Sequence, residues 1–192
     1  MAGPFDVERR PRGREQAAPA LSCTSAVAAD TLTTEPGGRR VEIYVDADAC
    51  PVKDETYRVA GRYGLHVRVV TARWMRVPSD PGIHLEVVEE TGGLDAADDW
   101  IVERVGTGDV VVTEDVHLAA RCVEKGALAL TPRGKEFTSS SVGEAVAMRD
   151  LMTNLREAGV DTGGPAPFQK TDRSNFLQRL DEMVNRVRRE AR

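Results

Sequence analysis

Residues 41–51 read Val-Glu-Ile-Tyr-Val-Asp-Ala-Asp-Ala-Cys-Pro. An apolar run ends there in two carboxylates, Asp46 and Asp48, and Pro51 stands where the first turn of a helix can begin. If the run is a buried parallel strand, its carboxyl end brings both carboxylates to the crevice in which open α/β sheets bind ligands. The alternative is that Asp48 caps the next helix and Asp46 is a solvated strand end. The stretch therefore predicts an α/β fold and offers an acidic site for a metal ion.

The rest of the chain from position 41 alternates apolar runs with segments of helical period. Further strands are predicted at residues 66–70, 85–88, 109–113 and 127–130. A helix is predicted after each of these strands except the one at 66–70, which a loop joins to the next strand. After the last strand, Ser141 and Glu144 form a capping box. Strands that alternate with helices imply right-handed crossovers and a parallel sheet covered on both faces.

Composition limits the classes of function. The 192 residues carry 26 basic and 31 acidic side chains, a formal net charge of -5, which argues against broad, sequence-blind binding of nucleic acid. The three cysteines are too few and too far apart in sequence for a disulfide framework or a zinc site, so the reducing cytoplasm is the predicted location. No apolar stretch is long enough to span a membrane, so no membrane partner is expected.

Three regions are predicted along the chain. Residues 1–39 lack a sustained apolar period and are rich in Arg, Pro, Ala, Ser and Thr, so we expect them to be disordered. Residues 40–169 form the α/β domain. Residues 170–192 form a basic amphipathic helix whose apolar face is expected to dock on the domain or on another subunit, as in a homo-oligomer. The basic residues of this helix either solvate its surface or hold a nucleic-acid backbone.

Further acids are expected at the edge of the sheet that carries Asp46. Thr113 ends the predicted strand at 109–113 and Asp115 follows it, and Asp95 and Asp98 lie at the start of the helix before that strand. Surface solubility is the alternative explanation for this acidic run. Carboxylates forced into one crevice repel one another and are stabilised by a hard cation, and oxygen ligands point to Mg²⁺ or Mn²⁺. Two such ions can hydrolyse a phosphodiester.

Several segments together carry a resemblance to a known family. They are Val45-Asp46-Ala47-Asp48-Ala49-Cys50-Pro51, Gly93-Leu94-Asp95-Ala96-Ala97-Asp98, Gly108-Asp109-Val110-Val111-Val112-Thr113, Pro132-Arg133-Gly134 and Met148-Arg149-Asp150-Leu151-Met152. In this order and spacing they resemble the YaiI/YqxD family of bacterial proteins, over residues 41–192. That family is similar to the PIN-like group of Mg²⁺- or Mn²⁺-dependent ribonucleases. The resemblance implies a three-layer PIN-like domain with a mainly parallel central sheet flanked by helices.

The resemblance also implies roles for individual residues. Asp46, Asp98 and Asp115 would be the catalytic metal ligands, with Thr113 holding a ligand or water through its hydroxyl group. Asp48 and Asp95 would be additional ligands or would accept hydrogen bonds beside them.

Three other residues have open roles. Lys53 and Arg133 would bind substrate phosphate, or else Lys53 is solvated and Arg133 pairs with a nearby carboxylate. Cys50 is a candidate nucleophile, but a buried structural cysteine is the favoured interpretation.

Three functions are compatible with the sequence. The first is a PIN-like metal-dependent nuclease acting on RNA. The second is a haloacid-dehalogenase-like phosphatase with Asp46 as nucleophile and Asp48 as acid, although the paired acidic motif that it needs after a later strand does not appear downstream of Asp115. The third is a catalytically degenerate protein that binds RNA or a protein partner.

Overall fold

The structure is a computed structural model that describes residues 41–48, 50–89, 95–163 and 166–190. The disorder expected for residues 1–39 therefore lies outside the described residues. The elements are β1 Glu42–Asp46, α1 Lys53–Tyr63, β2 His66–Thr71, β3 Ile83–Val87, α2 Ala96–Arg104, β4 Val110–Val112, α3 Val116–Glu124, β5 Leu128–Leu130, β6 Glu136–Phe137, α4 Val142–Glu157 and α5 Lys170–Glu190.

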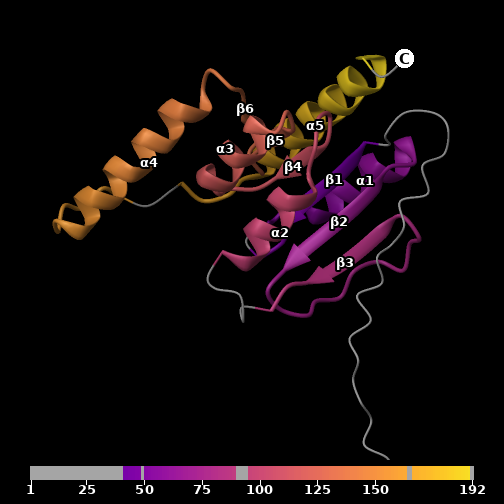
Figure 1. The fold of residues 1–192 in the computed structure, drawn as a ribbon, viewed down its shortest axis with the longest axis horizontal. Helices are drawn as coiled ribbons and strands as arrows, with labels where there is room; N and C mark the ends of the chain where they lie inside the picture. The colour runs from indigo at the N-terminus through magenta and orange to yellow at the C-terminus, as the bar shows by residue number, and fades with distance from the viewer. Residues whose placement is uncertain (1–40, 49, 90–94, 164–165, 191–192) are drawn as a thin grey trace, which may run out of the picture. The chain divides into compact units, whose positions relative to one another are not determined.

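The strands form a single six-stranded sheet in the order β3-β2-β1-β4-β5-β6 (Figure 1). The first five strands are parallel, and β6 pairs antiparallel with β5. The chain passes from β1 to β2 on one side and later returns to β4 on the other, so strand order reverses between β1 and β4. Such a reversal opens a crevice at the carboxyl ends of the two strands. The predicted α/β class is confirmed; β6, only two residues long, was not predicted.

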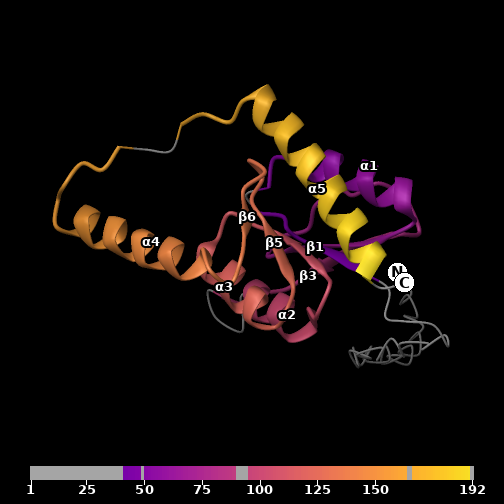
Figure 2. The same cartoon turned by 90° about the horizontal axis from the view of Figure 1, so that it is seen from above.

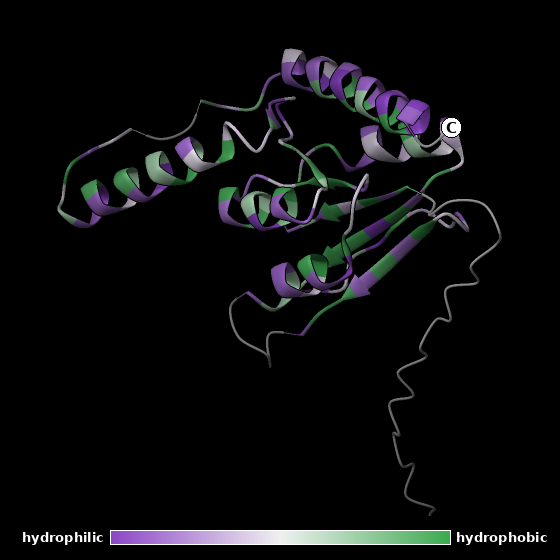
Figure 3. Ribbon diagram, turned by 45° about the horizontal axis from the view of Figure 1, so that its top comes forward, coloured by the Kyte–Doolittle hydropathy of each residue, from purple (hydrophilic) through white to green (hydrophobic). Residues whose placement is uncertain are grey.

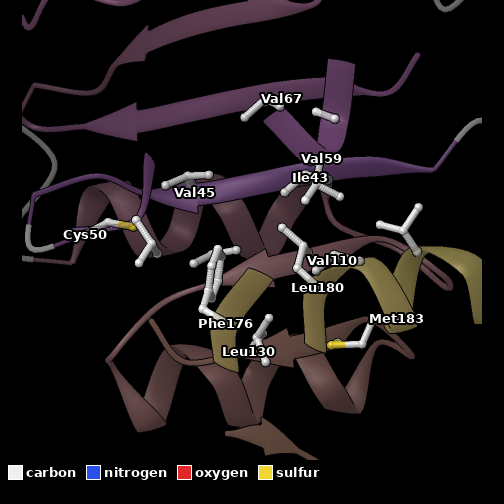
Figure 4. Packing of buried hydrophobic residues seen from close by; sticks show 14 of the residues in the cluster. Ile43, Val45, Cys50, Val59, Val67, Val110, Leu130, Phe176, Leu180 and Met183 are labelled. Atoms are coloured by element: carbon white, nitrogen blue, oxygen red, sulfur yellow. The ribbon is translucent and has the colours of Figure 1, made fainter. Parts of the chain in front are cut away.

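Helices cover both faces of the sheet, as Figures 1 and 2 show. Alternate residues of a strand point to opposite faces, so Ile43 and Val45 pack toward α1 and α5, whereas Tyr44 packs toward α2 and α3. On the first face, buried side chains from β1, β2, β4 and β5 meet Val59 of α1 and Phe176 of α5 (Figure 4). The three-layer arrangement predicted from the sequence is thus confirmed.

The predicted C-terminal helix is present as α5. Its apolar face is buried against the domain through Phe176, Leu180, Met183, Val184 and Val187. At its start, Arg173 Nη1 donates to both carboxylate oxygens of the buried Glu55, at 3.0 Å each. Further along, the Asp181 carboxylate accepts hydrogen bonds from Arg62 of α1 and from the Tyr63 hydroxyl. Apolar burial and these polar contacts together fix α5 along α1 (Figure 2).

Two predicted helix starts are wrong in detail. Helix α1 begins at Lys53 with Val52 as N-cap, so Pro51 lies in the preceding turn and not in the first helical position, and Asp48 does not cap the helix. Ser141 is the N-cap of α4, but its side chain accepts a hydrogen bond from the Thr138 amide and makes no capping bond. The side chains of Asp48 and Ser141 thus form hydrogen bonds with residues that lie outside the helices that they were expected to cap.

Helix α4 is amphipathic but only its first turn is buried. Val142 and Ala145 pack with Ala119 and Phe137, whereas Met148, Leu151 and Met152 are 37–50% exposed. Figure 3 shows the hydrophobic residues that recur along this helix. No helix among the described residues combines the length and the apolarity that a membrane span requires.

Candidate functional site

The Asp-x-Asp motif at the end of β1 lies between two buried threonines. Asp46 is the last residue of β1, and its Oδ2 accepts a hydrogen bond of 2.8 Å from the hydroxyl of Thr113, which follows β4. Asp48 Oδ1 accepts one of 2.6 Å from the hydroxyl of Thr71, the last residue of β2. The threonines are 1% and 2% exposed, respectively. The strands on both sides of β1 therefore each orient one carboxylate of the motif.

Asp115 joins the same edge through the start of α3. Its Oδ1 caps this helix by accepting hydrogen bonds from the amides of His117 and Leu118, at 2.7 and 3.2 Å. Its own amide donates to Thr113 Oγ1 at 2.9 Å. The Thr113 hydroxyl thus links the backbone at Asp115 to the carboxylate of Asp46. Within the described parts of the chain, Asp115 Oδ2 accepts no hydrogen bond.

Helix α2 contributes Asp98 from the other covering layer. The helix is anchored by Ile101 and Val105 in the core and by Trp100, whose ring lies 6.5 Å from that of Tyr44 on β1. Asp95 is the N-cap of α2, but its side chain makes no capping hydrogen bond. Asp98 in the first turn faces the acids of the strand ends, whereas Asp99 pairs with Arg121 of α3 at 2.5 Å.

The carboxylates repel one another. Burial, followed by the charges of Asp46, Asp115 and Asp95, raises the pKa of Asp98 from its ordinary 3.8 to about 6. Burial also raises the pKa of Asp46. The hydrogen bond from Thr113 lowers this pKa, whereas the charges of Asp48 and Asp115 raise it further, and the net shift is upward. Each of these carboxylates therefore senses the charge of others that are distant in sequence.

The two predicted phosphate ligands are already engaged. Lys53 Nζ donates to the carbonyl oxygen of Ala47, within the Asp-x-Asp motif, at 2.9 Å. Arg133 binds Asp172 Oδ2 at 3.1 Å and the carbonyl oxygen of Ala166, so it holds the segment that leads into α5. Lys53 thus lies beside the acidic residues, whereas Arg133 pairs with a carboxylate, one of the two alternatives left open by the sequence.

Cys50 lies near the acidic edge but is buried. Burial raises the pKa of its thiol to about 11. The reactive form of a cysteine nucleophile is the thiolate, which is scarce at neutral pH when the pKa is this high. The structure therefore supports the interpretation of Cys50 as a core residue.

The chemistry of these side chains suits a hard divalent cation. The donors are carboxylate and hydroxyl oxygens, as Mg²⁺ and Mn²⁺ prefer, and the raised pKa values show a negative cluster that a cation would stabilise. In the part of the chain that the structure describes, no three His, Cys, Asp or Glu side chains are placed so that they could hold one ion. The carboxylates thus face one another at electrostatic range without converging on one point.

Thr71 is the residue of this site that the sequence interpretation missed. Besides Asp48 Oδ1 it contacts the carbonyl oxygen of Arg73, at 2.9 Å. Asp48 Oδ2 also accepts a hydrogen bond from the amide of Ala72, at 3.2 Å. A signal was available, since Thr71 ends an apolar strand just as Thr113 follows another.

Comparison with known proteins identifies a bacterial family and several similar proteins. The family described as "Uncharacterized BCR, YaiI/YqxD family" matches residues 44–186. A UPF0178 protein of Rhodopseudomonas palustris (strain BisB18) is 57% identical over 147 residues, which cover 77% of this chain and 94% of that protein. Another, of Paramagnetospirillum magneticum, is 55% identical over 148 residues, 77% of this chain and 97% of that protein.

A third UPF0178 protein, from Nitrobacter winogradskyi, is 54% identical over 149 residues, 78% of this chain and 94% of that protein. No solved structure matches the chain. The match with the family covers most of the α/β domain and most of α5, and the relatives align over nearly their whole length. The chain therefore belongs to the YaiI/YqxD family.

Proposed function

We propose that this chain is a cytoplasmic nuclease that depends on Mg²⁺ or Mn²⁺ and hydrolyses phosphodiester bonds, with RNA as its substrate. The observation that carries the proposal is that the Thr113 hydroxyl joins the Asp46 carboxylate to the backbone of Asp115, close to Asp98, whose pKa is raised by burial and then by the charges of Asp46 and Asp115. These three aspartates come from β1, α2 and the start of α3, so only the fold brings them together. A cluster of this kind costs stability unless a cation is bound.

Asp46, Asp98 and Asp115 would hold the ion, with Asp48 and Asp95 as further oxygen donors. The ion, when bound, lowers the pKa of a water molecule and neutralises negative charge on the phosphate. To hold one ion, these carboxylates would have to lie closer together than they do here.

The described residues prepare this site by orienting its carboxylates. The Thr113 hydroxyl donates to Asp46 and accepts from the amide of Asp115, so it fixes the first ligand relative to the start of α3. The Thr71 hydroxyl fixes Asp48 in the same way from β2. Side chains held by such partners need less rearrangement to meet a ligand, which raises affinity for a given set of contacts.

Calorimetric titration of Mn²⁺ tests the proposal. We expect Asp46→Asn and Asp98→Asn each to weaken Mn²⁺ binding more than about 10-fold, because even residues that only support ligands have effects of this size. Asp99→Asn is the matched control: it removes the same charge from the next position of α2, but the Asp99 carboxylate pairs with Arg121 of α3 and is not one of the proposed ligands. Equal binding by the wild-type protein and Asp46→Asn would remove Asp46 from the ligand set.

Incubation of the wild-type protein with mixed-sequence RNA and Mn²⁺ then tests the reaction. Cleavage that is lost in Asp46→Asn and kept in Asp99→Asn is the expected result. Binding of Mn²⁺ without cleavage would instead favour the degenerate alternative. Trapping of a phosphoaspartate analogue on Asp46 with beryllofluoride would favour the phosphatase.

A further inference from the structure

Two pockets flank the turn at residues 131–135, one beside the start of α3 and one beside α5, and together they are called the groove here. Its first part is a pocket of about 230 Å³ lined by Glu114, Val116, Thr131, Arg133, Lys135 and Phe137. Its second part, of about 450 Å³, is lined by Arg133, Gly134, Lys135, Asn175, Gln178, Arg179 and Glu182. Arg133 and Lys135 line both pockets, so the two pockets adjoin at this turn. Glu114, which lies between Thr113 and Asp115, places the near end at the candidate site.

The lining of the second pocket favours an anion. It includes the cations Arg133, Lys135 and Arg179 and the amide side chains of Asn175 and Gln178, against the single acid Glu182. Arg179 Nη1 binds Glu182 Oε2 at 3.0 Å, and Gln178 binds Glu182 Oε1 at 3.0 Å. This exposed pair occupies Glu182, whereas Nε and Nη2 of Arg179 donate no hydrogen bond within the described residues. Lys135 has no ion pair within the described residues; its ammonium lies 5.6 Å from the centre of the Phe137 ring.

The turn that presents Lys135 is fixed. The Thr131 amide donates to the Lys135 carbonyl oxygen at 2.9 Å, and the Lys135 amide donates to Thr131 Oγ1 at 3.0 Å. Gly134 has φ +83, and a Cβ there would lie 2.9 Å from the backbone of Asn175, so the turn packs directly on α5. Arg133 adds its ion pair with Asp172 of α5. A cation on such a support loses little conformational freedom when it binds a ligand.

We propose that this groove binds the sugar-phosphate backbone of single-stranded RNA and guides it from Arg179 and Lys135 to the acidic cluster. The inference rests on the proposed nuclease function: without a bound cation, the negative charges of the acidic cluster would repel the phosphates of RNA. Pockets of a few hundred Å³ accommodate a ligand of small-molecule size, which suits a short stretch of one strand. Lys135 and Arg179 contact phosphates, and the amide of Asn175 donates to phosphate or ribose oxygens.

Binding of a fluorescent single-stranded RNA, measured by anisotropy in EDTA, tests the groove without any metal. We expect Lys135→Ala and Arg179→Ala each to weaken binding about 5-fold to 10-fold. Each phosphate contact to a single strand contributes about 0.7 to the slope of log affinity against log salt concentration, so the double variant should have a slope smaller by about 1.4. Lys135→Arg keeps the charge and is expected to restore binding. Arg58→Ala is the matched control, because Arg58 is exposed on α1, outside the groove.

The outcomes separate this inference from the nuclease proposal. A double variant with wild-type affinity and salt slope would overturn the groove, as would a wild-type protein without affinity for RNA. Binding in EDTA that depends on Lys135 and Arg179, without cleavage when Mn²⁺ is added, would support the groove and contradict the nuclease. Cleavage with an unchanged KM in the double variant would support the nuclease and contradict the groove.

Discussion

The two ends of strand β1 hold their carboxylates in opposite ways. At the amino end, Glu42 accepts hydrogen bonds from Arg68 Nε at 2.9 Å and from the Tyr44 hydroxyl at 3.0 Å. Burial opposes ionisation of Glu42, but the hydrogen bond and the charge of Arg68 outweigh it and hold the pKa of Glu42 below its ordinary 4.5. At the carboxyl end, burial and neighbouring acids raise the pKa of Asp46.

Asp109 extends this contrast to the next strand. It precedes β4 at the amino edge, is 0% exposed, and accepts hydrogen bonds from the amides of Glu42 and Gly106, at 3.1 and 3.0 Å. Acids at this edge thus satisfy backbone amides and an arginine, and they stabilise the fold. The acids of the opposite edge also accept hydrogen bonds from amides or hydroxyl groups, but Asp46 and Asp98 form no ion pair with an arginine or lysine among the described residues, and their pKa values are raised. Such carboxylates are typical of functional sites, which are held at a cost in stability.

The largest effect on stability is expected at Asp109. Asp109→Ala leaves two backbone amides of the amino edge without their acceptor, and each such loss costs about 1–3 kcal/mol, so unfolding should become easier by about 3 kcal/mol. Urea denaturation measures this. Asp80→Ala is the matched control, since exposed Asp80 also accepts from one amide, that of Gly82, and should cost less than about 1 kcal/mol. Similar losses in both variants would contradict a structural role specific to the amino edge.

A smaller loss is expected at Arg68. Arg68→Met leaves Glu42 and Glu86 without their shared partner, and we expect a loss of about 2 kcal/mol at pH 7, because the three side chains are only 20–30% exposed. Since the pKa of Glu42 is lowered on folding, its contribution is present above pH 4.5 and is lost as the pH falls through the lower folded value. Urea denaturation at pH 7 and pH 3 should therefore show the difference between variant and wild type shrinking in acid.

The fold was predictable from local sequence, because each strand and helix carries its own signal. The valines of 110–112 and the apolar run of β1 form buried strands, and Gly64 ends α1 in the left-handed conformation, as a C-terminal glycine predicts. Strand β6 was missed because its two residues are too short for any periodic signal. The pattern of α4 indicated a helix, but it does not specify how much of its apolar side is covered.

Parts of the candidate site were predictable because parallel strands end at one edge. That rule places Asp46 and Asp115 together, although their role as metal ligands stays a prediction. The partners of charged residues were harder to find. Arg133 binds Asp172, 39 positions away, and Asp48 binds Thr71, 23 positions away. Such pairs depend on how α5 and β2 pack on the domain, and a single sequence does not specify this.

The smallest effect, and the most diagnostic, is expected at Asp98. The pKa of the Asp98 carboxyl group is 3.8 in the unfolded state and about 6 in the folded state. Between these pH values the folded state keeps a proton that the unfolded state has released. The free energy of unfolding therefore falls as the pH rises from about 4 to about 6. Asp98→Asn does not titrate. At pH 7.5 in EDTA, the variant should therefore be more stable than the wild-type protein by about 1 kcal/mol, a value that is reduced because solvent screens this partly exposed group. Below about pH 4 the difference in stability should disappear.

Addition of Mn²⁺ should reverse this order if the acids of the carboxyl edge are metal ligands. A cation that binds the folded wild-type protein raises its melting temperature by mass action, whereas Asp98→Asn lacks a ligand and should respond less. Asp99→Asn should follow the wild-type protein both in EDTA and in Mn²⁺, because its exposed ion pair with Arg121 contributes little. If Asp98→Asn were less stable than the wild-type protein at pH 7.5 in EDTA, Asp98 would stabilise the fold as Asp109 does, and the contrast between the two edges would fail.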